Sequence, residues 1–179
     1  MREELETARL RLRRFRSDDL ETLVRWHADP ELMRHMGKRS FSRAEVEAMA
    51  VRHERHWQRH GFGLWAVEEK ETGEVVGRAG IAFHRAWPDD PEVGWLVDLP
   101  WQGRGYATEG GDACVRYAFE ELEFPRVVSI CVRENTASRR VMEKLGFVEW
   151  QEVEDPVLGL TLVVHRRDRA GLDRPGRTS

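Results

Sequence analysis

The chain has 179 residues, of which 40% are hydrophobic and 34% are charged, and its formal net charge is −3. This length excludes two independent catalytic domains, and balanced charge with this hydrophobic content excludes a disordered chain. A sequence pI near 6.2 also removes the electrostatic basis of a general nucleic-acid binder.

The predicted elements follow from hydrophobic periodicity and helix-end signals. In chain order they are a strand at 5–15, helices at 17–29 and 42–60, strands at 62–69, 75–83 and 92–98, a helix at 107–121, a strand at 126–132, a helix at 135–145, and strands at 147–153 and 160–165. Ser17 is expected to cap the first helix, and a capping box of Ser42 and Glu45 starts the second. This order predicts a single layered α+β domain over residues 1–169 and a flexible C-terminal tail over 170–179.

The cysteine count and the polar N-terminus bear on the cellular compartment. Cys114 and Cys131 are too few for a disulfide framework and lack CxxC spacing, which indicates a reducing cytoplasm. No stretch approaches 18 consecutive apolar residues, and the start MREELETARL is charged where a signal peptide is apolar. We therefore expect a cytoplasmic protein with no membrane partner and no direct nucleic-acid partner.

A glycine turn with the sequence QGRGYAT occupies residues 102–108, where a predicted strand leads into a predicted helix. Glycines let the backbone approach a ligand, and the first N–H groups of a helix favour an anion, so phosphate is the expected guest. The turn is not a P-loop, which needs Lys then Ser or Thr after its second glycine. It is not a dinucleotide fingerprint either, which needs Gly where Thr108 stands. Taken alone, such a glycine pair is more often a structural turn.

A second motif, NTASRRVMEKLGF, occupies residues 135–147. The pattern Q-x-x-G-x-A in 102–107, followed by N-x-x-S and a closing EKLGF in 135–147, resembles the GNAT superfamily of acyl-CoA-dependent N-acyltransferases. The resemblance covers most of the chain. Within the superfamily, the sequence is similar to the Rim-type ribosomal-protein N-terminal acetyltransferases. It implies a GNAT-like fold, with a central mixed, mostly antiparallel sheet of about seven strands, a splay between the fourth and fifth strands, and about four flanking helices.

The resemblance also implies acetyl-CoA as co-substrate. In the family, main-chain N–H groups of the glycine turn hold the CoA pyrophosphate, and pantetheine lies between the strands predicted at 92–98 and 126–132. The residues that this assigns to CoA binding are Leu96, Val97, Gln102, Gly103, Arg104, Gly105, Tyr106, Ala107, Thr108, Asn135, Ser138 and Arg140. The backbone N–H groups near Leu96 and Val97 are expected to hold the thioester oxygen as negative charge develops.

Acyl transfer requires a neutral amine, whereas a free lysine amine has a pKa of about 10.4 and an α-amine about 7.7–8.0. A base must therefore take a proton. Glu92, at the start of the predicted strand that leads to the glycine turn, is our first choice, acting directly or through a water. The alternative is a surface glutamate at a strand start.

The departing thiolate needs a proton or another form of stabilisation. Many members of the family use a Tyr seven residues after the motif Asn, but Met142 stands there and has no proton to offer. Ser138 or an ordered water is the alternative donor, and Ser138 also fits a helix-start hydroxyl that contacts backbone. Asn135 fits a helix cap and, by the resemblance, a contact to pantetheine or the acceptor.

Three other patterns are given structural roles. His53, His56 and His60 are expected on a solvated helix face, since their spacing does not fit a zinc protease, and no metal is expected. No cysteine lies in a nucleophile-base pattern, which predicts direct attack in a ternary complex. The seven tryptophans mostly fill a core and leave room for a homodimer.

The acceptor is the least defined part of the prediction. Residues 30–41 and 83–91 are expected to shape its pocket and match no known pattern. A protein N-terminal amine is the leading choice, and a small amine such as an aminoglycoside, a polyamine or a free amino acid is the first alternative. A longer donor such as succinyl-CoA and a non-catalytic acyl-CoA-binding sensor also stay open.

Overall fold

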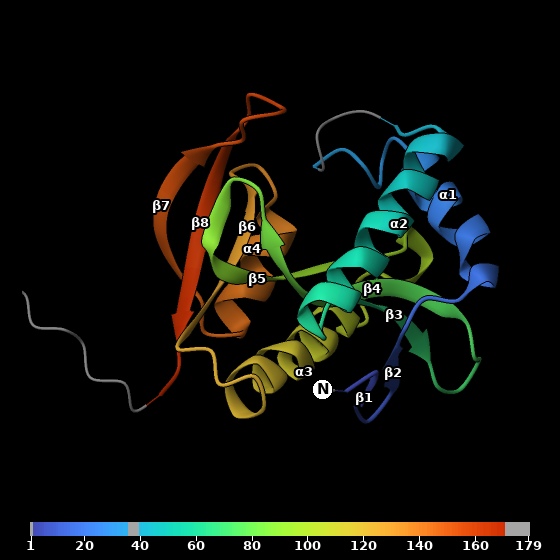
Figure 1. Ribbon diagram of the computed structural model, residues 1–179, viewed down its shortest axis with the longest axis horizontal. Coiled ribbons are helices and arrows are strands. Elements are labelled where there is room, and N and C mark those ends of the chain that lie inside the picture. The colour runs from blue at the N-terminus through green and yellow to red at the C-terminus, as the bar shows by residue number, and fades with distance from the viewer. Residues whose placement is uncertain (1, 36–39, 171–179) are drawn as a thin grey trace, which may run out of the picture.

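The computed structural model describes residues 2–35 and 40–170 (Figure 1). Its strands are β1 (Glu4–Glu6), β2 (Leu10–Arg13), β3 (Leu64–Glu69), β4 (Val75–His84), β5 (Trp87–Val97), β6 (Arg126–Val132), β7 (Val148–Glu154) and β8 (Thr161–Asp168). Its helices are α1 (Leu20–Ala28), α2 (Arg43–His60), α3 (Tyr106–Glu120) and α4 (Thr136–Lys144), with short 3₁₀ turns at Ser17–Asp19 and Leu99–Trp101. Beyond residue 170, the predicted tail lies outside the described residues.

The strands form one sheet in the order β1-β2-β3-β4-β5-β6-β8-β7. Neighbours are antiparallel except β5 and β6, which are parallel. The register of β5 and β6 holds a single pair, Glu92 with Val128, whereas β4 and β5 pair along most of their length. Because β5 and β6 are the fourth and fifth predicted strands, the predicted splay and the α+β fold are confirmed.

The described sheet has one strand more than the seven or so predicted, because the expected strand at 5–15 is two strands. The chain turns at residues 7–9, where the Leu10 N–H donates to Thr7 Oγ1 and the Thr7 N–H donates to the Leu10 carbonyl, both at 2.9 Å. β1 then pairs back on β2. The turn residues Thr-Ala-Arg include no Gly, Pro, Asn or Asp, so the sequence has no turn signal there.

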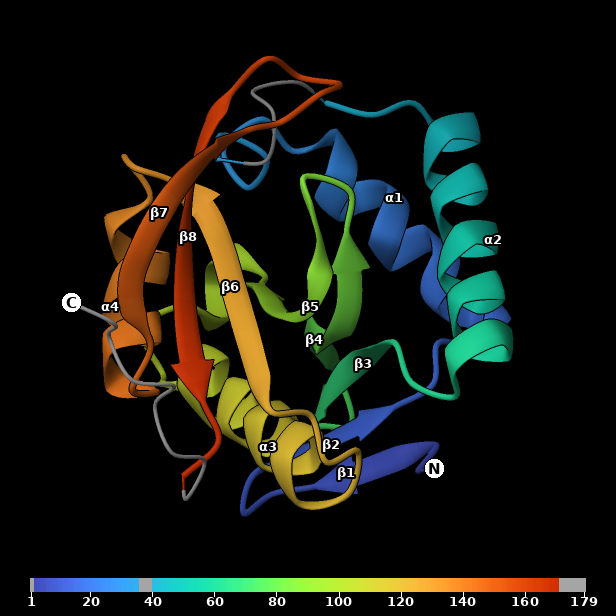
Figure 2. The same ribbon diagram turned by 60° about the vertical axis from the view of Figure 1, so that its left-hand side comes forward.

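Two hydrophobic cores lie on opposite faces of the sheet. The larger core joins the sheet to α3 and α4 and includes Val93 and Met142. The smaller core joins it to α1 and α2 and includes Trp26, Val46 and Leu96. β5 borders both cores, because successive side chains of a strand point to opposite faces. Figures 1 and 2 show α1 and α2 together at one side of the molecule and β6, β7 and β8 at the other.

α2 begins and ends as predicted. Ser42 and Glu45 form the capping box, and Gly61 ends the helix in the left-handed conformation with φ 72°. Of its 18 residues, Val46 and Trp57 are buried, and many of the others are charged. In the described part of the chain, no helix has both the length and the apolar content that a membrane span requires.

The start of α1 was predicted wrongly. Residues 17–19 form a 3₁₀ turn, the helix begins at Leu20, and Ser17 does not cap it. The buried Asp19 carboxylate accepts bonds from two nitrogens of Arg13, at 2.8 and 3.0 Å, and from the Arg16 N–H at 2.7 Å. These bonds hold the chain in a tighter turn before the helix begins.

β5 begins at Trp87 rather than at residue 92, so most of the segment 83–91 expected as a loop is hairpin. Pro88 and Pro91 lie within this strand, although proline cannot donate to a ladder. The hairpin accommodates them by a register shift between Ala82 and His84, where β4 and β5 exchange few bonds.

Candidate functional site

The glycine turn leaves a run of backbone donors without a partner at the start of α3. The Gln102 N–H donates to the Leu99 carbonyl at 3.2 Å, and the Glu109 N–H donates to the Gly105 carbonyl at 3.0 Å. Between them, the N–H groups of residues 103–108 donate to no described residue. Six consecutive donors at the positive end of a 15-residue helix form an anion-binding arrangement.

Two glycines make this backbone path accessible. Gly103 and Gly105 have φ of 77° and 84°, a region that costs other residues about 1–2 kcal/mol. Gln102 Nε2 donates to the Val97 carbonyl at 3.0 Å and fixes the turn to the end of β5. The guanidinium of Arg104 stacks 4.5 Å over the Trp101 ring, so this cation lies beside the turn.

α3 lies very close to the sheet. A Cβ at Gly111 would lie 2.8 Å from Leu145 and 3.2 Å from Trp95, and one at Gly110 would lie 3.5 Å from Ala79. Glycine within a helix costs roughly 0.5–1 kcal/mol relative to alanine, so close packing is the physical reason for this pair. This packing sets the position of the unpaired N–H groups relative to β5. The sequence analysis did not identify the Gly110–Gly111 pair.

Leu96 and Val97 differ in the direction of their backbone donors. The Asp98 N–H donates to Val76 on β4 at 2.9 Å. Because donors alternate along a strand, the Val97 N–H points away from β4 toward the splay, and the Leu96 N–H points to β4. The structure therefore directs the Val97 N–H into the gap between β5 and β6, while the Leu96 side chain packs against α1.

Glu92 lies where β5 and β6 make their only registered pair. Its half-buried side chain runs over Gly94, whose ideal Cβ would be 3.7 Å from Glu92 Oε1, on the face of β5 that also holds Leu96. Burial raises the pKa of Glu92, against the opposing effects of His84, Arg78 and a bond from the Ile130 N–H. A carboxylate with a raised pKa beside the splay has the properties of a general base.

Arg78 on β4 is a neighbour of Glu92 that the sequence prediction missed. It is 9% exposed, and burial lowers its pKa while the Glu92 charge opposes that shift. Two histidines lie in its electrostatic field. Burial, with Arg78 as a further cause, lowers the pKa of His53 to about 3 and also lowers that of His27. An arginine in an apolar strand was the only sequence signal for this group.

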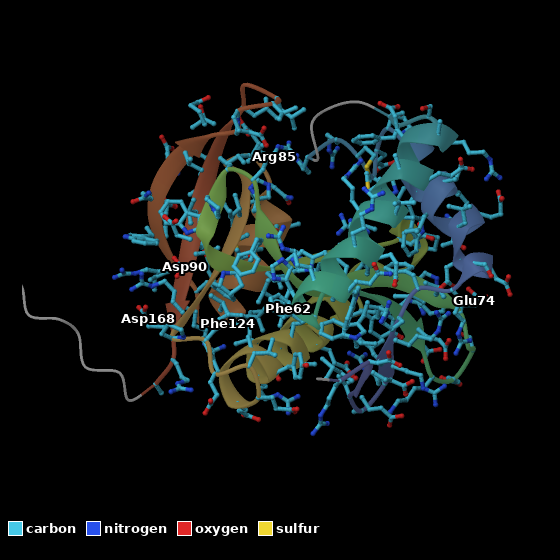
Figure 3. The ribbon with its side chains drawn as sticks, viewed as in Figure 1. Phe62, Glu74, Arg85, Asp90, Phe124 and Asp168 are labelled. Atoms are coloured by element: carbon cyan, nitrogen blue, oxygen red, sulfur yellow. The ribbon has the colours of Figure 1, made fainter. Side chains whose placement is uncertain are left out.

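The expectation of a solvated histidine face on α2 is wrong. His53, His56 and His60 are half-buried, and the Phe62 carbonyl lies 2.9 Å from His56 Nδ1. Figure 3 shows Phe62 and Phe124 beside each other near the centre of the molecule, with ring centroids 5.5 Å apart. Across residues 2–35 and 40–170, no group of three or more His, Cys, Asp or Glu is placed to hold a metal ion.

The second motif forms the start of α4. Asn135 caps the helix, its side chain accepting the Ser138 N–H at 3.1 Å, as predicted. Ser138 is half-buried on the first turn, and Arg140 is exposed. Met142 is fully buried in the larger core.

The two cysteines are buried, as expected of core residues. Burial raises the pKa of Cys131 to about 11 and that of Cys114 still further. Neither thiol is therefore activated as a nucleophile at neutral pH.

Residues 9–148 match the family model of the acetyltransferase (GNAT) domain. The chain belongs to the GNAT acetyltransferase family. The Bacillus subtilis protein YkkB is 33% identical over 144 residues, which cover 79% of this chain and 83% of YkkB. The FsC-acetyl coenzyme A-N(2)-transacetylase of Aspergillus fumigatus is 33% identical over 158 residues, which cover 79% of this chain and 63% of that enzyme.

Solved GNAT structures share the fold. An acetyltransferase from Agrobacterium tumefaciens superposes with a TM-score of 0.81 and 28% identity, over 93% of this chain and 94% of that one. RimL, a ribosomal L7/L12 alpha-N-protein acetyltransferase solved with coenzyme A, has a TM-score of 0.77 and 15% identity, over 93% and 98%. Spermidine N-acetyltransferase from Vibrio cholerae, solved with CoA and spermine, has a TM-score of 0.74 and 18% identity, over 91% of this chain and 97% of that one. The resemblance drawn from the two motifs is confirmed, and the chain is an acetyltransferase.

Proposed function

We propose that this GNAT enzyme transfers an acetyl group from acetyl-CoA to a protein N-terminal amine by direct attack in a ternary complex. The observation that carries the proposal is the run of unpaired N–H groups over residues 103–108, which lies at the end of β5 where β6 diverges. A diphosphate bound there would direct pantetheine into the splay, toward Val97 and Glu92. Exposed Arg140 and stacked Arg104 supply cations for the CoA phosphates.

The reaction needs one proton removed and one supplied. The amine nitrogen attacks the thioester carbonyl carbon, and the Glu92 carboxylate accepts the amine proton, directly or through a water. The Val97 N–H stabilises the developing oxyanion. The carbon–sulfur bond then breaks, and the CoA thiolate takes a proton from Ser138 or from a water, because Met142 has no proton to give.

The acceptor choice rests on likeness to the Rim-type enzymes, among them RimL, an alpha-N-protein acetyltransferase. A small-molecule amine is the second candidate, and a specific observation favours it. Spermidine N-acetyltransferase from Vibrio cholerae, which is named for a small polyamine, shares the fold with a TM-score of 0.74 and 18% identity, against 0.77 and 15% for RimL.

The test is release of CoA thiol from acetyl-CoA in the presence of different acceptors. The panel contains a peptide with a free α-amine, the same peptide N-acetylated but with a free lysine, spermidine and an aminoglycoside. We expect release with the free α-amine peptide alone, with the product identified by mass spectrometry. Release only with a small amine would overturn the protein acceptor, and saturable CoA binding without any acceptor-dependent release would overturn catalysis itself.

A further inference from the structure

The turn between β1 and β2 contacts the glycine turn, about a hundred residues later in the chain. Arg9 Nη1 donates to the Arg104 carbonyl at 3.0 Å, and Arg9 Nε donates to Glu109 Oε2 at 2.8 Å. The Arg9 backbone N–H also donates to Glu109 Oε1, at 2.9 Å. One arginine therefore joins the glycine turn to the first turn of α3.

The contact with Arg104 has a directional consequence. A trans peptide unit places its carbonyl and the following N–H on opposite sides. Because the Arg104 carbonyl points to Arg9, the Gly105 N–H points to the opposite side, away from Arg9. Arg9 thus orients a peptide in the middle of the run of unpaired donors.

The contact with Glu109 has an electrostatic consequence. A carboxylate in the first turn of α3 favours the helix dipole but repels an anion bound at the same helix end. Arg9 Nη2 lies 2.6 Å from Glu109 Oε2, and Thr7 Oγ1 donates to Glu109 Oε1 at 2.7 Å. Burial raises the pKa of Glu109, but the bonds from Thr7 and Arg9 outweigh it and keep the carboxyl charged. The Glu109 carboxylate therefore stays ionised, and the neighbouring Arg9 guanidinium offsets its negative charge.

The position of Arg9 is itself fixed. The Lys70 N–H donates to the Arg9 carbonyl at 3.0 Å, and Lys70 Nζ donates to the Thr7 carbonyl at 2.7 Å. The Arg9 guanidinium lies 4.8 Å from the centre of the Tyr106 ring. Its side chain is half-exposed, yet it is held from two directions.

We propose that Arg9 is a positioning residue for the CoA diphosphate. It aims the Gly105 N–H at the anion and neutralises Glu109, so that α3 presents a net positive end to the ligand. This inference rests on the proposed role of residues 103–108.

The experiment compares the affinities of three probes for wild type and Arg9→Ala. CoA and 3′-dephospho-CoA contain the diphosphate and are titrated by calorimetry, whereas pantetheine lacks it and is titrated by NMR. We expect Arg9→Ala to weaken both diphosphate ligands by about tenfold and pantetheine not at all. Arg11→Ala is the matched control, because Arg11 is similarly exposed and pairs with Glu4, away from the glycine turn.

Two further variants separate the two effects of Arg9. Arg9→Lys keeps the charge but lacks the fork that reaches Arg104 and Glu109 together, so its loss should be intermediate. Adding Glu109→Gln to Arg9→Ala should recover part of the lost affinity, because the uncompensated carboxylate is then gone. Arg9→Lys also preserves the local charge balance, so this variant provides the test if Arg9→Ala does not fold.

The outcomes are separable. Equal weakening of pantetheine would mean general damage and overturn the inference, as would unchanged CoA binding by Arg9→Ala. No recovery in the double variant would overturn the electrostatic part. Absence of CoA binding by wild type would overturn the proposed function and the inference with it.

Discussion

Arg85, in the turn between β4 and β5, binds both carboxylate oxygens of Asp155, with distances of 3.1 Å from Nε to Oδ1 and 2.7 Å from Nη2 to Oδ2. Asp155 is 2% exposed and also accepts the N–H groups of Val157 and Leu158. Burial raises its pKa, but these partners outweigh burial and hold the pKa of Asp155 below its ordinary value. The pair fixes the tip of the β4–β5 hairpin, where Figure 3 labels Arg85, to the β7–β8 loop.

Removing the two partners should have unequal effects on stability. We expect Asp155→Ala to lower the free energy of unfolding by about 2–3 kcal/mol, because the N–H groups of Val157 and Leu158 and the guanidinium of Arg85 all lose their acceptor. Arg85→Ala should cost about 1 kcal/mol, since its side chain is 48% exposed and solvent screens the pair. Urea unfolding of both variants measures the difference. Equal losses would show that the ion pair, rather than the backbone bonds, dominates.

Gly103→Ala should impair CoA binding beyond its effect on stability. Gly103 and Gly73 have nearly the same φ, 77° and 73°, and neither would bring a Cβ within 4 Å of another atom. Alanine should therefore cost each site about 1 kcal/mol of folding free energy. Only Gly103→Ala shifts the backbone of the glycine turn, so only this variant should lose CoA affinity, about tenfold or more by calorimetry. Similar CoA affinities in both variants would remove the glycine turn from the site.

Glu92→Gln should reduce kcat by at least about 100-fold without changing the Kd for CoA. The base must be ionised, so kcat of the wild type should fall as the pH decreases through the raised pKa of Glu92, above the ordinary value of 4.5. In Glu92→Gln this acidic limb should disappear. Exposed Glu120 provides the control Glu120→Gln, which should keep both the rate and the limb. Retention of the limb in Glu92→Gln would assign the base to another group.

His53 should make the protein less stable in mild acid. Its pKa is about 3 in the folded chain and about 6.5 when unfolded, so the unfolded state binds the proton first. The free energy of unfolding should therefore fall as the pH drops below about 6.5, by up to about 1.4 kcal/mol per pH unit from this group. Thermal melts of His53→Asn should show a shallower decline between pH 6.5 and 5. At pH 8 the group is neutral in both states, so a difference in slope there would contradict this explanation.

The parts of the fold that the sequence predicted are those with local signals. The bounds of β6 were predicted to the residue, and the capping box placed α2 correctly. Both motifs lie at strand-to-helix junctions, and the family resemblance that they carry implied the splay between β5 and β6. The turn at 7–9 was missed, because its residues carry no turn signal.

The surroundings of the site depend on contacts between distant segments. Arg9 meets Glu109 across a hundred residues of chain, and no periodic pattern connects them. Arg78 lies within an apolar strand, and His56 and His60 of α2 pack against the rings of Phe62 and Phe83, which follow α2 in the chain. The roles of Glu92, Ser138 and the glycine turn were inferred from motif position and remain predictions.

The alternation along β5 also constrains how such an enzyme diverges. Val93 and Trp95 pack toward α3, the helix whose start carries the unpaired N–H groups, whereas Glu92 and Leu96 lie on the face of β5 that meets α1 and α2. On the proposed mechanism, substitutions on the α1–α2 side would change which amine is accepted while the thioester carrier stays the same. A single strand with two chemically independent sides would then let acceptor preference drift between related enzymes without loss of the shared donor.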